Sequence, residues 1–309
     1  MVIARFVLVL LLAVVNVRSG DAQTMKLSVL LPPVDTAAEI FIAQDMGFFA
    51  KQGLDVQIEP GTNGSAIAAA VSTDAVDIGY SDMVTLAKAH LKGIDFVAVA
   101  PAAIWTSAAP TAALVVQTNS PIKTAKDLAG KVIAIPGLST LAEYSPRAWI
   151  DQNGGDDTTV KFIEMPYSAM PAAITAGRID AAYISEPFLA DVRSGVRILG
   201  YAHNAVAKEF LQSAWFASSQ WAKDHPELVR RFTAAMRETA IWANQKTNYA
   251  RSGAILAKYS QTDPAVIAKM VRATFGVTLT VASIQPAIDV SAKYGNFTAF
   301  PASVLIYKP

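Results

Sequence analysis

An internal repeat constrains the fold of this chain more than any other feature of the sequence. Residues 30–39 (LLPPVDTAAE) align with residues 134–143 (AIPGLSTLAE), at a spacing of 104 residues. Residues 69–80 (AAVSTDAVDIGY) align with residues 172–183 (AAITAGRIDAAY), at a spacing of 103 residues, and the order of the two segments is kept. Solenoid repeats have periods of about 20–50 residues, so this period is too long for one. The repeat predicts two similar lobes that face each other across a cleft.

The pattern of apolar residues indicates the fold class of these lobes. Short apolar runs such as 26–31 and 131–135 alternate with segments of helical pattern such as 36–52. This alternation is typical of an α/β fold with mostly parallel sheets. The chain has 309 residues, of which 52% are hydrophobic, which is enough for two separate cores.

The extent of the repeat sets the boundaries of the lobes. A helical tail (226–294) follows the second copy, matches neither copy, and is expected to return to the first lobe. We therefore predict lobe 1 at residues 25–112 plus 214–309 and lobe 2 at residues 113–213, joined by two hinge strands near Gln117 and near Ser213.

The N-terminus has the pattern of a secretory signal, which we place at residues 1–22. Arg5 is followed by an unbroken apolar run at 6–15, which is too short to span a bilayer. Removal of this segment takes two basic residues from 26 and one acidic residue from 25, which leaves 24 of each. A chain without net charge has no general electrostatic attraction to nucleic acid, so no nucleic-acid partner is expected.

Signals for catalysis and for metal binding are weak. The absence of cysteine excludes disulfides, thiolate metal ligands and a cysteine nucleophile. His90, His203 and His225 are far apart and have no metal-ligand spacing. The nucleophile-elbow, phosphate-loop and dinucleotide glycine motifs are also missing from the sequence. We therefore expect a binding protein without catalytic residues, metal or cofactor.

Both copies of the repeat contain a possible helix start. Thr36 with Glu39 and Thr140 with Glu143 fit a capping box, and each box follows the carboxyl end of a predicted strand. Ligands of α/β sheets bind at such strand ends, and the free N–H groups of a helix start attract anions or polar acceptors. The alternative interpretation is a capped helix without a ligand.

Two carboxylates follow the later strands of the two copies. Asp82 comes just after the Tyr80 strand, and Glu186 comes just after the Tyr183 strand. Each is either an acceptor aimed into the cleft or an ordinary helix cap or loop acid. Tyr167 lies in a loop near a strand end, where it could stack on a flat ligand or pack between loops.

Several motifs together resemble those of one family. These are AQDMGFFAKQGLDV at 43–56, SPIK at 120–123 with DLAGK at 127–131, IDAA at 179–182 and EPF at 186–188. The chain resembles the nitrate/sulfonate/taurine and thiamine-pyrimidine group of periplasmic substrate-binding proteins, and the resemblance extends over most of residues 26–260. It implies a type II periplasmic binding fold, a periplasmic location and a monomer that delivers a small molecule to an ABC permease and its ATPase.

The resemblance also implies which residues contact the ligand. The loops assigned to the cleft contain no Lys or Arg, so their carboxylates favour a nitrogen heterocycle, such as a pyrimidine, or a neutral organic solute. An organic anion such as an alkanesulfonate, taurine, nitrate or an aromatic carboxylate stays open, because helix N–H groups could hold it. A cleft enzyme that uses Asp82 and Glu186, and a ligand-sensing module, are the alternatives from other classes. The predicted ligand-binding residues are Asp35, Thr36, Ser65, Ser81, Asp82, Ser139, Thr140, Tyr167 and Glu186.

Overall fold

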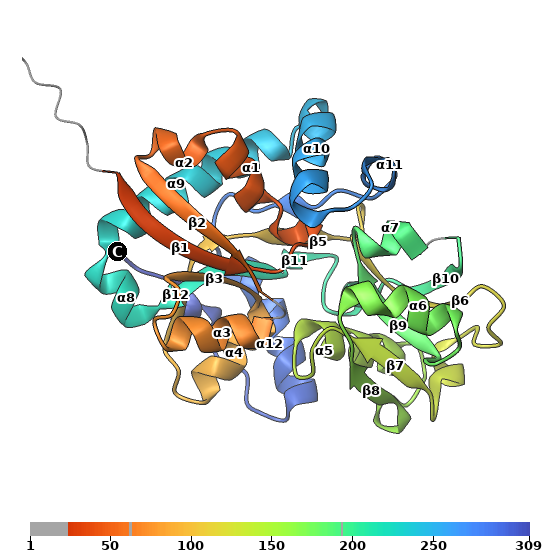
Figure 1. Cartoon of the computed structure of the whole chain (residues 1–309). Helices are drawn as coiled ribbons and strands as arrows, with labels where there is room; N and C mark the ends of the chain where they lie inside the picture. The colour runs from red at the N-terminus through yellow and green to blue at the C-terminus, as the bar shows by residue number, and fades with distance from the viewer. Residues whose placement is uncertain (1–23, 62–63, 193) are drawn as a thin grey trace, which may run out of the picture.

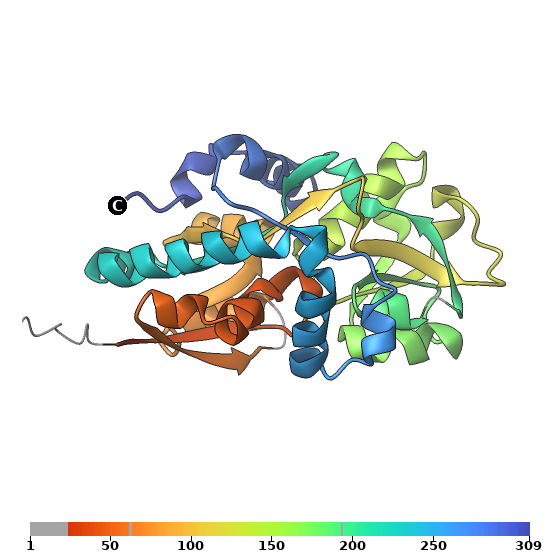
Figure 2. The same ribbon diagram turned by 90° about the horizontal axis from the view of Figure 1, so that it is seen from above.

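Two five-stranded sheets, each covered by helices, form two lobes that lie side by side (Figures 1 and 2). The computed structural model describes residues 24–61, 64–192 and 194–309. The predicted signal segment, residues 1–22, lies outside the described residues.

The first sheet has the strand order β2-β1-β3-β12-β4. The strands β1 to β4 run in one direction, and β12 runs antiparallel between β3 and β4. The alternating burial of β1 reflects its apolar pattern, because every second side chain enters the core. The bounds are β1 (Met25–Leu31), β2 (Leu54–Pro60), β3 (Ile78–Asp82), β4 (Phe96–Pro101) and β12 (Ser213–Ser218).

The second sheet repeats this order as β8-β7-β9-β6-β10. Here β6 is the antiparallel strand, and it lies between β9 and β10. The predicted α/β fold with two mostly parallel sheets is therefore confirmed. The bounds are β6 (Ala112–Gln117), β7 (Val132–Ile135), β8 (Lys161–Glu164), β9 (Ala181–Ser185) and β10 (Val196–Gly200).

The repeat extends to individual hydrogen bonds. Asp77 accepts a hydrogen bond from the backbone N–H of Ser28 at 2.7 Å, before β3 begins. Asp180 does the same for Val132 at 2.9 Å, before β9 begins. Each carboxylate therefore joins the start of one strand to the first strand of its own sheet, in equivalent positions of the two lobes.

The helices differ in part from the sequence prediction. The single helix predicted over 36–52 is wrong, because Gly47 adopts a left-handed conformation (φ 75°) and separates α1 from α2. The helical tail predicted over 226–294 is also interrupted, because α11 ends at Ile267. The bounds are α1 (Glu39–Asp45), α2 (Phe48–Lys51), α3 (Gly64–Ser72), α4 (Met83–Leu91), α5 (Leu141–Gln152), α6 (Met170–Thr175), α7 (Phe188–Val192), α8 (Ser219–Asp224), α9 (Pro226–Ala243), α10 (Tyr249–Ser260), α11 (Pro264–Ile267) and α12 (Val281–Gly295), with 3-10 turns at Asp35–Ala37, Ala125–Leu128, Asp157–Thr159, Tyr167–Ala169, Ala202–Ala205, Lys246–Asn248 and Ala302–Leu305.

The chain crosses between the sheets through a small third sheet, in the order β11-β5-β13. The outgoing strand β5 (Ala103–Thr106) pairs antiparallel with the returning strand β11 (Glu209–Leu211), and β13 (Thr274–Phe275) pairs with β5. The return crossing runs directly into Ser213, as predicted. The crossing predicted near Gln117 is wrong, because Gln117 is the last residue of β6, which lies inside the second sheet between β9 and β10.

The helical tail covers more than the first lobe. The helix α9 packs on α1 and α2, and α10 packs on α1, as the sequence predicts. The helix α12, however, contacts both α4 of the first lobe and α5 of the second. Its buried residues Ile284 and Ile288 belong to an apolar cluster that includes Leu86 of α4 and Tyr144 of α5. Among the described helices, none combines the length and the apolar character needed to cross a membrane.

Candidate functional site

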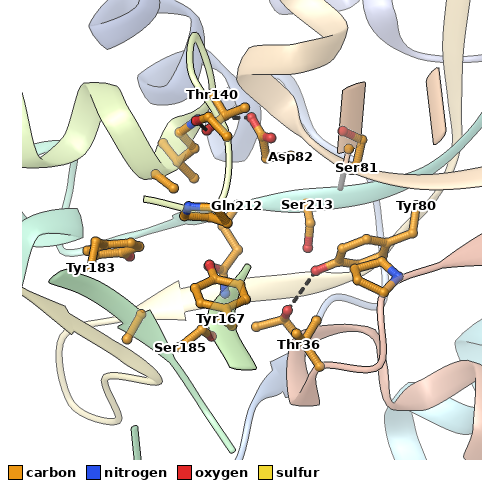
Figure 3. A pocket seen from close by; sticks show the side chains of 18 of the residues that line it. Thr36, Tyr80, Ser81, Asp82, Thr140, Tyr167, Tyr183, Ser185, Gln212 and Ser213 are labelled. Atoms are coloured by element: carbon orange, nitrogen blue, oxygen red, sulfur yellow. Dashed lines mark hydrogen bonds between the residues drawn. The ribbon is translucent and has the colours of Figure 1, made fainter. Parts of the chain in front are cut away.

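A cavity of about 130 Å³ lies between the two lobes (Figure 3). It is found at the carboxyl ends of β1, β3, β7 and β9, where ligands of open α/β sheets bind. The residues that line it are Pro32, Val34, Thr36, Gly64, Tyr80, Ser81, Asp82, Ala112, Pro136, Gly137, Thr140, Leu141, Ala142, Tyr167, Tyr183, Ser185, His203, Gln212 and Ser213.

Each copy of the repeat contributes one threonine and one tyrosine to this cavity. Thr36 and Tyr80 come from the first lobe, and Thr140 and Tyr183 come from equivalent positions in the second. The Tyr80 hydroxyl donates a hydrogen bond to Thr36 Oγ1 at 2.8 Å. The Thr140 hydroxyl donates to the Gly137 carbonyl at 2.7 Å, which leaves its oxygen available as an acceptor. The duplication seen in the sequence is therefore also a duplication of the cavity wall.

Asp82 joins the starts of two helices across the cavity. It caps α4, because Oδ1 accepts from the Thr85 N–H at 3.0 Å and Oδ2 accepts from the Thr85 hydroxyl at 2.8 Å. The same Oδ1 lies 3.2 Å from the backbone N of Leu141, the first residue of α5 in the other lobe. A carboxylate of the protein therefore already occupies the helix start in the second lobe that an anionic ligand would use.

Burial raises the pKa of Asp82, and the hydrogen bonds from Thr85 and Leu141 act in the opposite direction. Its charge is the only one that the described lining residues can carry near neutral pH, because Lys and Arg are missing among them.

His203 stays neutral near pH 7, since burial lowers its pKa to about 3. The Tyr183 hydroxyl lies 2.7 Å from His203 Nδ1, and Ser145 Oγ lies 2.8 Å from the same nitrogen.

Three side chains of the cavity have unused hydrogen-bond donors. Ser81 Oγ and Gln212 Nε2 are buried and have no partner among the described residues. The Tyr167 hydroxyl likewise bonds to no described residue, and burial raises its pKa, so it stays protonated. The Tyr167 ring stacks on Phe188 with ring centroids 5.9 Å apart. The wall thus combines flat aromatic faces with donors that a ligand can satisfy.

The structure brings five of the nine predicted site residues to the cavity. These are Thr36, Ser81, Asp82, Thr140 and Tyr167. The other four, Asp35, Ser65, Ser139 and Glu186, are not among its lining residues.

The carboxylates of Asp35 and Glu186 are occupied by the tail of the chain. Asp35 is fully buried, pairs with Arg272 at 3.1 Å and accepts from the Ala273 N–H at 2.5 Å. Burial raises the pKa of Asp35, and the Arg272 charge lowers it. Glu186 accepts from the Ala190 N–H at 2.8 Å and from the Val271 N–H at 3.4 Å. Both carboxylates therefore hold the segment before β13 in place and do not face the cavity.

The two serines line a different hollow, between α3, α4 and the loop before α5. Ser139 has a left-handed backbone (φ 61°), and its N–H donates to Glu143 Oε2 at 2.6 Å. The second capping box is therefore wrong: Glu143 accepts from the N–H of Ser139 instead of Thr140, and the Thr140 side chain accepts from no N–H of the helix start. The first box is wrong: Thr36 lies inside a 3-10 turn, and Glu39 accepts a hydrogen bond from Trp215 Nε1.

Sequence reasoning missed several cavity residues. Tyr80 and Tyr183 were identical in the aligned copies, and this identity was the signal that could have found them. His203 and Gln212 belong to the return crossing and Ser213 begins β12, and none of the three lies in the repeated segments of the sequence. Within the described ranges, no group of three or more His, Cys, Asp or Glu side chains could hold a metal ion.

The fold and the position of the cavity define a two-lobed binding-protein architecture. The chain belongs to the NMT1/THI5-like family, whose model matches residues 36–250. This confirms the family predicted from the sequence motifs.

Known proteins are similar to this chain in sequence or in structure. A chain of Brucella abortus, named as a candidate binding protein, is 26% identical over 239 residues, which are 72% of this chain and 68% of the relative. The solved structure of the alkanesulfonate-binding protein SsuA from Xanthomonas axonopodis pv. citri, bound to MOPS, superimposes with a TM-score of 0.77 at 16% identity, and the match covers 93% of this chain and 100% of that one. The aliphatic sulphonate-binding protein SsuA from Escherichia coli gives a TM-score of 0.73 at 18% identity, with 89% and 92% covered.

Proposed function

We propose that this protein is the periplasmic solute-binding component of an ABC importer. It captures one small organic solute between its lobes and delivers it to the permease and ATPase. The family, the two-lobed architecture and the cavity at the strand ends support this proposal. Export would use residues 1–22, and N-terminal sequencing of the secreted protein tests that part.

The solute is a nitrogen heterocycle or another uncharged ring. The absence of Lys and Arg among the described lining residues, beside the carboxylate of Asp82, carries this assignment. A negative charge placed here would repel that carboxylate in a partly desolvated cavity. An engineered cavity of about 150 Å³ binds benzene, so a cavity of about 130 Å³ suits one small ring.

An organic anion is the second candidate, and the fold similarity to the alkanesulfonate-binding proteins favours it. Such a ligand would have to displace Asp82 from the Leu141 N–H before the start of α5 could hold it. The two candidates therefore predict opposite changes in the affinity for the solute when the Asp82 charge is removed.

Calorimetric titration of the purified protein separates these candidates. The ligands are pyrimidine and uracil on one side, and taurine and nitrate on the other. We expect the wild type to bind the rings more tightly than the anions. Asp82→Asn keeps the shape and one acceptor oxygen, so it should raise anion affinity about tenfold, since about 1.4 kcal/mol of repulsion is removed.

Asp45→Asn is the matched control, because it removes an exposed carboxylate outside the cavity and should leave both affinities unchanged. Tighter binding of taurine or nitrate than of every ring by the wild type would contradict the uncharged-ring assignment. A ring recovered chemically altered after incubation would instead favour an enzyme.

A further inference from the structure

Resting on the proposed function, we propose that Gln212 determines the specificity of the cavity by donating a hydrogen bond to a carbonyl oxygen on the ring of the ligand. Ser81 supplies a second donor. The substrate class is thereby narrowed to uncharged rings that carry an exocyclic carbonyl group.

The unused donor of Gln212 is the observation that carries this proposal. Gln212 Nε2 is buried, with the residue only 7% exposed, and it has no hydrogen-bond partner among the described residues. Such a group costs its full desolvation energy unless something satisfies it, and native structures contain few of them. Because the side chain lines the cavity, a ligand is the partner that can satisfy it (Figure 3).

Two backbone hydrogen bonds fix the position of Gln212 in the return crossing. Its N–H donates to the Ala103 carbonyl at 3.1 Å, and its own carbonyl accepts from the Met83 N–H at 3.1 Å. These two bonds hold the backbone of Gln212 in place beside the cavity that its side chain lines.

The chemistry of the remaining wall selects the kind of acceptor. A carboxylate or sulfonate oxygen is disfavoured by the Asp82 charge, so the acceptor is uncharged. Tyr167 and Tyr183 offer aromatic faces on which a flat ring stacks. A carbonyl oxygen and a ring nitrogen both meet these conditions, but the carbonyl oxygen has two lone pairs and can accept from two donors, whereas the ring nitrogen has only one. Ser81 Oγ, from a residue only 1% exposed, is a second donor at the wall without a partner among the described residues.

A titration with matched rings tests this proposal. One set carries an exocyclic carbonyl: uracil, 4-pyrimidinone and 2-pyridone. The other set lacks it: pyrimidine, 4-methylpyrimidine and pyridine. We expect the wild type to prefer the first set. Gln212→Met should lower the affinity for the carbonyl rings roughly ten- to a hundredfold and leave the other set within about threefold, as expected when one donor to a buried acceptor is lost.

Gln212→Glu replaces the amide donor by a carboxylate, which can only accept, and should therefore also lower the affinity for the carbonyl rings. Gln117→Met is the matched control, because it makes the same chemical change at an exposed side chain that bonds the Thr175 carbonyl. Melting temperatures show which variants fold. If Gln212→Met does not fold, Ser81→Ala and Gln212→Glu decide, since the Ser81 hydroxyl bonds to no described residue.

Equal losses for both ring sets, or a wild type that does not distinguish them, would overturn the inference and leave the proposed function intact. If only the rings without a carbonyl bind, the inference is likewise overturned. If neither set binds, the uncharged-ring assignment itself fails, and the inference fails with it.

Discussion

Burial strongly changes the pKa of one side chain in this protein, that of Glu39. It is fully buried, Oε1 accepts from Trp215 Nε1 at 2.5 Å, and Oε2 has no partner among the described residues. Burial raises its pKa well above the ordinary value of 4.5, and the bond from Trp215 acts in the opposite direction. Since the folded state keeps the proton that the unfolded state loses, Glu39 lowers stability as the pH rises above about 4.5.

We therefore expect Glu39→Gln to be more stable than the wild type near pH 7 and similar to it near pH 4. The amide oxygen can still accept from Trp215, and no proton has to be held. Chemical denaturation between pH 4 and 8 measures this difference. Asp77→Asn is a control whose carboxylate is only part-buried and bonded to Ser28. A stability difference that does not grow with pH would contradict the neutral state of Glu39.

At the level of elements, the helical tail makes the same kind of contact with each lobe. Lys258 and Tyr259 of α10 contact Asp45 of α1, at 2.7 and 3.0 Å. Lys293 and Tyr294 of α12 contact Asp151 of α5, at 2.6 and 2.8 Å. The same Lys-Tyr pair therefore docks on the corresponding helix of each lobe. The first contact lies within one lobe, whereas the second ties α12, which also packs on α4, to the other lobe.

This difference predicts unequal effects of two equal substitutions. Asp45→Ala and Asp151→Ala each remove an exposed ion pair, so both should change the melting temperature only slightly. Only Asp151→Ala loosens a contact between the lobes, and it should weaken ligand affinity a few-fold. Calorimetry with the best-binding ring compares the two variants. Equal affinities would mean that α12 does not hold the lobes together.

The sequence predicted the elements whose signal is local. The apolar runs at 26–31 and 131–135 differ from the observed strands β1 and β7 by one residue, and the repeat predicted that the two sheets are alike. The sequence prediction placed Asp35 and Glu186 in the cavity, because no residue nearby in the sequence indicated their hydrogen-bond partners. Asp35 meets Arg272 and Ala273, which are 237 and 238 residues away. Such contacts depend on how the tail returns, which no periodicity encodes.

On the scale of the whole molecule, the two lobes are in contact across the cavity through Asp82 and Leu141. If the lobes rotate about β5 and β11, the ligand-free protein should open in solution and close when a ring fills the cavity. Small-angle scattering, with and without a saturating ring, should show a smaller radius of gyration for the bound form and the mass of a monomer. An unchanged radius at saturation would contradict the closure.

The interleaving of β12 with β3 and β4 has a consequence for the order in which the protein can be assembled. The second sheet is built from one continuous stretch, residues 112–200, and needs no strand from elsewhere. The first sheet begins near residue 25, but β3 and β4 become neighbours only through β12, which starts at Ser213. When the chain emerges with its N-terminus first, the second sheet, from the middle of the sequence, is therefore completed before the first sheet. The earliest residues to emerge are among the last to be fully ordered, and their apolar strands need protection until the chain returns.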